Sequence, residues 1–449
     1  MSDKTSDLLY RMLELAKEVG SSSAEAMSLE ETSQNIEVKN GKLEKAERSE
    51  SVGIGLRVFL GKRAASVSSS TTKLEYIREM TEKAIAMAAV APEDEYIGLA
   101  ENKQLCRNYD AKDLDLVDQS YASVTPKNLK EKALEMEDSL LSTKGVSQSE
   151  GSSASSNCIL MSLANSNGFI GSYKRTSFNL FCGAISGYDL EMERDHAFET
   201  RCHIGDLPSP KEIGLLAGAR AVERQRPKKP PTGQYPVLFD KRVSGSLIGH
   251  LTSAINGAAL VRGSSWLLNR AQKKVLPKDI SITEDPNRPK ISGSKPFDGE
   301  GLATQKKYFF QNGVYTKNIL DLRTSRKLGL EPTGNASRSI GSGPFPAAGN
   351  IEVSKGAQTV KEIISGISDG LLVTSLIGST INSNTGDYSR GATGFWIKNG
   401  EITHPVNECT IAGNLIEMFA DIIAANDIDT FKAMMVPSLL IRKMMIAGK

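Results

Sequence analysis

GSTINSNTGDYSRGATGFWIKNGEITHPVNECTIAGNL, residues 378–415 of a 449-residue chain, is the stretch that decides the fold. An apolar, aromatic segment at 394–397 precedes Asn399-Gly400, and a short segment leads on from that turn to Pro405. Asn-Gly between two such segments forms the tight turn of a β-hairpin, and a proline must leave the hydrogen-bonded ladder. The stretch therefore predicts a long hairpin in a β-rich part of the chain.

The segment ahead of this hairpin, residues 382–391, is polar and contains several turn-forming residues. Small polar side chains and glycines suit backbone that lies close to a ligand or to another chain. We therefore predict that this segment and the adjoining strand form the rim of a binding cleft. The candidate cleft residues are Asn382, Asn384, Thr385, Asp387, Arg390, Phe395 and Trp396.

Length and composition narrow the class of protein. A chain of 449 residues exceeds what one hydrophobic core normally covers, so its length indicates two or three domains. The formal net charge is only +2, which leaves no basic field for a nucleic acid. The five cysteines are widely spaced and form no Cys-x-x-Cys pair, which is typical of a reducing compartment. Without an apolar leader or a run of about 18 apolar residues, the sequence predicts a cytoplasmic protein outside the membrane.

Hairpin turns also occur throughout the first half of the chain. Asn40-Gly41 and Asn167-Gly168 stand between strand-like segments, and residues 52–60 alternate strictly before a further turn. Strands joined by tight turns form an antiparallel sheet. Separate strands are expected at 169–174, 177–185 and 190–200, and helices at 6–19, 73–90, 128–141 and 210–225.

Proline density marks a boundary between two domains. Residues 226–234, RPKKPPTGQ, contain three prolines, which force extended and semi-rigid backbone. We therefore assign residues 1–225 to an N-terminal α+β domain and residues 235–449 to a C-terminal β-rich domain. The predicted fold class is α+β, with an N-terminal antiparallel sheet that carries helices and a large, mostly antiparallel C-terminal domain with few helices.

An expected helix at 244–259 is the place where a metal site would be sought. A helical zinc site needs two imidazoles on one side of the helix and a carboxylate beside them. This helix offers only His250, near the edge of its apolar face. His404 and Cys409 lie close together farther along, but two ligands make no closed site. We therefore predict no metal on this chain and interpret His250 as a boundary residue of a packed helix.

Several blocks of sequence resemble those of a known family. The chain resembles the TldD/PmbA family, and within it the PmbA (TldE) branch, over almost its whole length and in the same order. The blocks that carry the resemblance are VKNGKLE at 38–44, GIGLRV at 53–58, RKLGL at 326–330, TGNA at 333–336, RGATGFWI at 390–397 and TIAGNL at 410–415.

The resemblance implies a two-domain subunit of a cytosolic metalloprotease that cleaves unstructured peptides. In this family a TldD-type partner carries His-Glu-x-x-x-His on a helix and a later cysteine, so zinc is expected on the partner. His250 marks the corresponding helix here, where the second histidine and the glutamate are missing, and Cys409 stands too early to be the third ligand. The resemblance therefore implies a non-catalytic subunit that shapes the peptide cleft, in a heterodimer with a TldD-like chain or in a homodimer.

Two other classes of function stay open at the level of sequence. The chain is a metallopeptidase in its own right if His250, His404 and Cys409 form a non-standard site. It is a non-enzymatic regulator if it binds a protein client without any protease partner. The family's association with peptide toxins and antitoxins, and its naming as modulators of DNA gyrase, imply a toxin or gyrase as that client.

Overall fold

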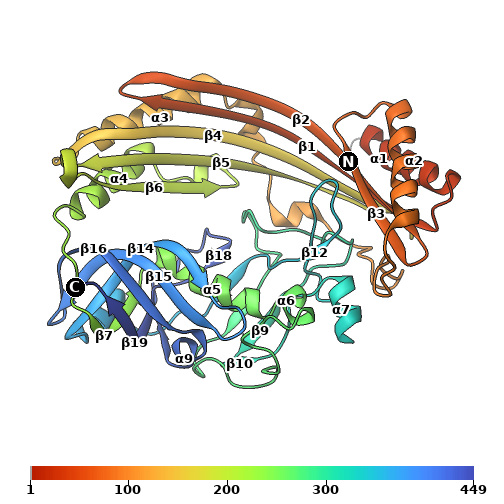
Figure 1. Ribbon diagram of the computed structural model, residues 1–449. Helices are drawn as coiled ribbons and strands as arrows, with labels where there is room; N and C mark the ends of the chain where they lie inside the picture. The colour runs from red at the N-terminus through yellow and green to blue at the C-terminus, as the bar shows by residue number, and fades with distance from the viewer. Residues whose placement is uncertain (1–2) are drawn as a thin grey trace.

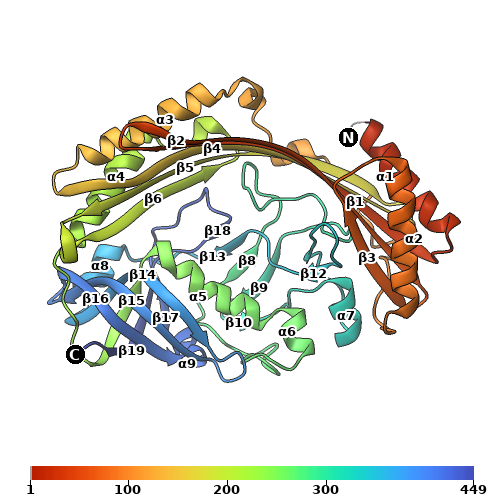
Figure 2. The same ribbon diagram turned by 45° about the horizontal axis from the view of Figure 1, so that its top comes forward.

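The long alternating segments of the first half form one six-stranded antiparallel sheet, ordered β3-β2-β1-β4-β5-β6. The computed structural model describes residues 3–449, and in it this sheet arches over the C-terminal half (Figures 1 and 2). Its strands are β1 Ser23–Lys39, β2 Lys42–Leu60, β3 Arg63–Ser69, β4 Val146–Asn165, β5 Ile170–Ser186 and β6 Glu193–Arg201.

Two pairs of helices bury apolar faces against opposite ends of this sheet. The pair α1 (Asp3–Glu18) and α2 (Leu74–Val90) shares a core with β1 and β2. The pair α3 (Pro126–Leu141) and α4 (Pro210–Glu223) shares a second core with β4, β5 and β6. Capping boxes begin both α3 and α4, because the side chain before each N-terminal proline accepts a backbone N–H of the first turn.

The C-terminal half contains a ring of strands that begins at β7 (Gly233–Phe239). The order is β16-β15-β14-β7-β19-β17, and an additional pairing of β16 with β19 closes the ring. This pairing joins residues 410–412 of β16 to residues 445–447 of β19, and the ring encloses an apolar core. The other strands are β14 Asp369–Ile381, β15 Asp387–Lys398, β16 Glu401–Asn414, β17 Ile422–Ala424 and β19 Leu439–Ala447.

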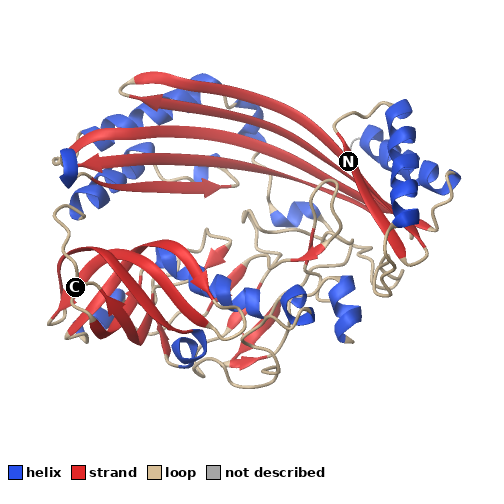
Figure 3. Ribbon diagram, in the orientation of Figure 1, coloured by secondary structure: helices blue, strands red, loops and turns tan. Residues whose placement is uncertain are grey.

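Beside the ring lie a five-stranded sheet, a two-stranded sheet and short helices (Figure 3). The five-stranded sheet is ordered β10-β9-β8-β13-β18, with bounds Val314–Tyr315, Lys307–Gln311, Ile282–Glu284, Ile351–Val353 and Met434–Met435. The two-stranded sheet pairs β11 (Ala336–Ser337) with β12 (Phe345–Pro346). The helices are α5 Lys241–Ala254, α6 Gly257–Val261, α7 Leu322–Leu328, α8 Val360–Ser365 and α9 Leu415–Ala420.

The fold class predicted from the sequence is confirmed. The Asn40-Gly41, Asn167-Gly168 and Asn399-Gly400 turns each connect adjacent antiparallel strands. Asn399 and Gly400 have φ of +51° and +80°, the left-handed values that a two-residue hairpin turn requires. The described part of the chain, residues 3–449, contains no helix that is both long and apolar enough to span a membrane.

Two details differ from the sequence predictions. The strands expected at 169–174 and 177–185 are one strand, β5, because buried Thr176 between them keeps the register and bonds to the carbonyl oxygen of Cys202. The helix expected at 244–259 is two helices, since α5 ends at Ala254 and the Asn256 side chain caps α6. The ring is mostly antiparallel, as predicted, and β14 with β7 is its parallel pair.

Gly394 on β15 lies close against the backbone of β14, and its substitution tests the packing of the ring. A Cβ atom there would stand 1.8 Å from the backbone oxygen of Leu372. Gly394→Ala is therefore expected to lower the free energy of unfolding by about 1–3 kcal/mol, measured by urea denaturation.

Gly249→Ala on α5 is the matched control, because its Cβ would meet nothing within 4 Å. Alanine favours helix over glycine, so this variant is expected to gain up to about 1 kcal/mol. Equal stability of Gly394→Ala and the parent chain would contradict the close approach.

Candidate functional site

A cavity of about 890 Å³ lies where the two halves of the chain face each other. Its walls come from β4, β5, β6 and the last turn of α4 on one side, and from the first turn of α5 with β14, β15 and β16 on the other. The lining is rich in arginine: Arg194, Arg220, Arg224, Arg242 and Arg390.

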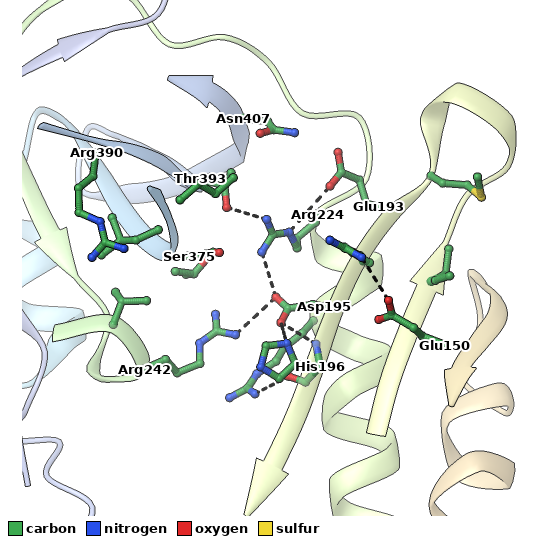
Figure 4. A pocket seen from close by; sticks show the side chains of 18 of the residues that line it. Glu150, Glu193, Asp195, His196, Arg224, Arg242, Ser375, Arg390, Thr393 and Asn407 are labelled. Atoms are coloured by element: carbon green, nitrogen blue, oxygen red, sulfur yellow. Dashed lines mark hydrogen bonds and ion pairs between the residues drawn. The ribbon is translucent and has the colours of Figure 1, made fainter. Parts of the chain in front are cut away.

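Asp195 on β6 holds the two walls of the cavity together. Its carboxylate is 3.2 Å from Nη1 of Arg224, the C-cap residue of α4, and 3.5 Å from Nη1 of Arg242 in the first turn of α5. The backbone N–H of His196 also donates to Asp195 Oδ1 at 2.7 Å. Asp195 is only 8% exposed, so this ionic contact is shielded from water. Figure 4 shows the carboxylate between the two guanidinium groups.

Arg224 extends the contact to the C-terminal ring. Its Nη2 donates to Thr393 Oγ1 at 2.6 Å, and its Nε lies 3.9 Å from Glu193 Oε2. Burial raises the pKa of Glu193, against the attraction of Arg224 and a hydrogen bond from Asn407. The same arginine thus contacts β6 on one wall and β15 on the other.

The helix α5 presents His250 to a separate part of the structure. Its ring packs edge-on against Tyr388 of β15, with ring centroids 5.9 Å apart. Within residues 3–449, neither His250 Nε2 nor Tyr388 Oη has a hydrogen-bond partner, although both atoms are buried. Burial and the nearby Arg390 lower the pKa of His250, and burial raises the pKa of Tyr388 to about 12. Both side chains are therefore neutral near pH 7.

The donor set around α5 does not fit a divalent metal ion. Across the described residues, no three His, Cys, Asp or Glu side chains are grouped so that they could hold one. Cys409 donates to the carbonyl oxygen of Ala392 at 3.2 Å, and burial raises the pKa of its thiol to about 11, so it stays protonated. His404 lines a different cavity and lies 3.0 Å from Thr403 Oγ1. The alternative ligand set of His250, His404 and Cys409 is thus not assembled.

The polar residues predicted to line a cleft form the turn between β14 and β15. Asn382 Oδ1 accepts the backbone N–H groups of Asn384 and Thr385 at 3.0 and 3.3 Å. Hydrogen bonds from Thr385 Oγ1 at 2.6 Å and from Asn414 at 3.1 Å lower the pKa of Asp387. These four predicted residues therefore stabilise a hairpin tip. Residue 383 of that tip lines a smaller cavity of about 350 Å³, which His250 also lines.

The other three predicted residues have different positions. Arg390 lines the large cavity, as expected for a cleft residue. Phe395 lines a third cavity of about 430 Å³ together with His404. Trp396 belongs instead to the core of the ring, where it is 4% exposed and packs edge-on against Tyr235. The strand β15 lies between β14 and β16, so its backbone is not open to an added peptide strand.

Sequence reasoning missed the residues that join the two walls. Glu193-Arg194-Asp195 did carry a signal, because consecutive charges on a predicted strand place at least one of them on its buried face. Arg224 and Arg242 carried none, since each lies on a helix where an arginine is ordinary. Only the folded chain brings these two helices to the same carboxylate.

Two blocks of the family resemblance contribute to packing. Arg326 donates to the backbone oxygens of Tyr96, Gly98 and Leu99 at 2.8–3.1 Å and so fixes the N-terminal half against α7. Asn335 donates to both oxygens of Glu284 at 2.8 Å, beside the buried Glu284–Lys307 ion pair. These blocks therefore hold the fold together and lie outside the lining of the large cavity.

Family models match three segments of the chain: residues 24–88 as PmbA/TldA metallopeptidase domain 1, residues 120–225 as the central domain and residues 232–448 as the C-terminal domain. The chain is 33% identical over 431 residues to the metalloprotease PmbA of Escherichia coli O157:H7, covering 96% of this chain and 93% of that one. It therefore belongs to the PmbA/TldA metallopeptidase family, which confirms the resemblance that the sequence blocks indicated.

Solved structures agree with this assignment. A protein of Bacteroides thetaiotaomicron described as a modulator of DNA gyrase superposes with a TM-score of 0.92 at 26% identity, and the match covers 100% of both chains. TldE of Thermococcus kodakarensis has the same fold, with a TM-score of 0.85 at 19% identity over 98% of this chain and 100% of that one.

The shielded carboxylate of Asp195 makes a testable contribution to stability. Asp195→Asn leaves two guanidinium groups close together without their shared counter-charge, so we expect a loss of about 3 kcal/mol in the free energy of unfolding by urea. Glu150→Gln is the matched control, because its ion pair with Arg194 is exposed and contributes at most about 1 kcal/mol. Equal effects of the two substitutions would refute a special role for Asp195.

The environment of His250 predicts a pH dependence. Its pKa is lowered in the folded state, so the unfolded chain binds the proton first, and stability falls as pH decreases below about 6.5. Arg390→Gln is expected to move the pKa of His250 upwards, because burial then acts without the positive neighbour. NMR titration measures this directly, since the chain has four histidines, and those on the first sheet and at its end serve as internal controls. An unchanged His250 titration in the variant would count against the contact.

Proposed function

We propose that this chain is a TldE-like subunit of a two-component metalloprotease of the TldD/TldE type, which cleaves unstructured peptides. In this proposal the chain holds no metal of its own and shapes the cleft in which the peptide lies. The observation that carries the proposal is the donor set of α5, where His250 stands without a second histidine or a carboxylate. Membership of a metallopeptidase family supports a role in proteolysis.

The division of labour follows from the chemistry of the residues. A zinc ion on a TldD-like partner would supply a water molecule acidic enough to attack a peptide carbonyl at neutral pH. This chain would bind and orient the peptide through the side chains of its large cavity and through the hairpin tip at 382–387. Side chains are the means of binding, because β15 is paired on both edges and cannot accept a peptide as an added strand.

The assembly that we propose is a heterodimer with a TldD-like chain, and a homodimer is the alternative. A cytoplasmic location is consistent with the cysteines, since all five are buried and unpaired among the described residues. We propose an unfolded peptide as the substrate, because a cleft that binds side chains does not require a folded surface on its ligand.

A reconstitution experiment tests the proposal. The chain is purified alone, a TldD-like chain of the same organism is purified alone, and each is assayed with an unstructured fluorogenic peptide separately and after mixing. We expect cleavage to rise at least tenfold on mixing and zinc, measured by elemental analysis, to follow the partner chain. Cleavage by this chain alone, with stoichiometric zinc, would overturn the proposal and favour a metallopeptidase with a non-standard site.

A non-enzymatic regulator is the second candidate, and the description of the Bacteroides structural neighbour as a modulator of DNA gyrase favours it. Co-purification from the native cell distinguishes the two candidates. Recovery of a client such as a toxin or gyrase without any TldD-like chain would support the regulator. Recovery of a TldD-like chain would support the protease subunit.

A further inference from the structure

The large cavity carries more positive than negative charge. Five arginines and three carboxylates line it, so its formal charge is +2 with His196 neutral. The three carboxylates, Glu150, Glu193 and Asp195, all have arginine partners within 4 Å. The excess charge therefore belongs to the arginines that these carboxylates do not reach.

Arg220 and Arg390 are those two arginines. Arg220 donates through Nη1 to the backbone oxygen of His196 at 3.0 Å, and Arg390 donates through Nε to the backbone oxygen of Gly378 at 2.7 Å. Within the described chain, neither has a carboxylate within ion-pair distance. Each uses one donor on a carbonyl group, although a guanidinium group carries five N–H donors in a planar fork.

The surroundings make this arrangement costly in the absence of a ligand. Burial and the neighbouring Arg242 lower the pKa of Arg220, and the more distant carboxylates of Asp195, Asp240 and Glu199 offset only part of this effect. The N-terminus of α5 points its positive dipole end towards the same cavity. Its first N–H groups are already taken by Ser438 Oγ and Asp240 Oδ1, so the available donors in this region are on the arginine side chains.

Apolar side chains share the cavity wall with these arginines. Ile185, Val243, Leu376 and Ile377 line the same space. An inorganic anion has no apolar surface to bury against these side chains. A nucleic acid would require a basic surface, which a chain of net charge +2 lacks. A volume of about 890 Å³ with mixed lining suits a short peptide segment that carries a carboxylate.

We propose that the cavity binds a carboxylate of an extended peptide, with Arg220 and Arg390 as its recognition residues. The proposal rests on the function proposed above and adds to it the chemical class of peptide that the subunit selects. The carboxylate is either the C-terminal one or that of an aspartate or glutamate side chain. Both present the planar pair of oxygens that a guanidinium group binds through two parallel hydrogen bonds.

Peptide binding to the purified chain, alone and after mixing with its TldD-like partner, tests the inference without relying on cleavage. Fluorescence anisotropy compares a labelled unstructured peptide with three versions of itself: a C-terminal amide, one with Asn and Gln replacing its acidic residues, and one with both changes. We expect the doubly neutralised peptide to bind about tenfold more weakly, and the single changes show which carboxylate is recognised.

Variants of the chain complete the experiment. Arg390→Gln and Arg220→Gln are each expected to weaken binding of the acidic peptide about tenfold. Binding of the doubly neutralised peptide is expected to stay unchanged. Arg78→Gln on α2 is the control, because it removes one positive charge outside the cavity. Thermal unfolding checks that the variants fold, and if Arg220→Gln does not, Arg390→Gln decides alone.

The outcomes separate this inference from the function on which it rests. Equal binding of the acidic and neutralised peptides would overturn the inference and leave the peptide-binding subunit intact. No binding of any peptide, with or without the partner, would overturn both. Competition by inorganic phosphate at the same concentration as the acidic peptide would show that the site selects any anion, and would overturn the assignment to a peptide carboxylate.

Discussion

The buried carboxylate of Asp195 is the constraint on which the walls of the large cavity depend. It contacts an arginine from each side of the extended connection between the halves, Arg224 before it and Arg242 after it. A shielded charge with two counter-charges has a narrow range of favourable geometries, because each displacement leaves a guanidinium group partly unpaired in a medium of low polarity. The walls of the large cavity are therefore fixed by electrostatics as well as by apolar packing.

The contact with Asp195 helps to fix the position of α5, so this helix does not need a bound metal ion to hold it in place. The helix is held at its first turn by Asp195 and along its length by the apolar core of the ring. His250 and Tyr388 meet with buried polar atoms that have no hydrogen-bond partner among residues 3–449, which costs free energy at a site that packing alone would fill with apolar groups. The contacts with Asp195 and with the core of the ring therefore determine the position of α5, and the unfavourable His250–Tyr388 contact does not.

The sequence predicted local structure better than it predicted the site, for physical reasons. Asn399-Gly400 and Asn40-Gly41 decide their turns within two residues, through backbone conformations that few other residues adopt. The site forms only where Asp195, Arg224 and Arg242 come together, and no periodic pattern in the sequence predicts that these three residues are in contact. Trp396 shows the opposite error: an aromatic residue beside a polar segment resembles a binding residue, but the pleat of β15 turns it into the core.

The arginines of the large cavity fall into two groups, one that holds its walls together and one that is available to a ligand. Arg224 and Arg242 share the carboxylate that fixes the two walls, whereas Arg220 and Arg390 each donate to a carbonyl oxygen and form no ion pair among the described residues. A negatively charged peptide can therefore approach the second pair without competing for the first, so binding need not loosen the contact between the halves. A cavity built with one set of charges for its shape and another for its ligand can keep its geometry while the peptide enters and leaves. Such a cavity is compatible with the proposed role, in which this subunit would position a peptide for chemistry carried out by a partner chain.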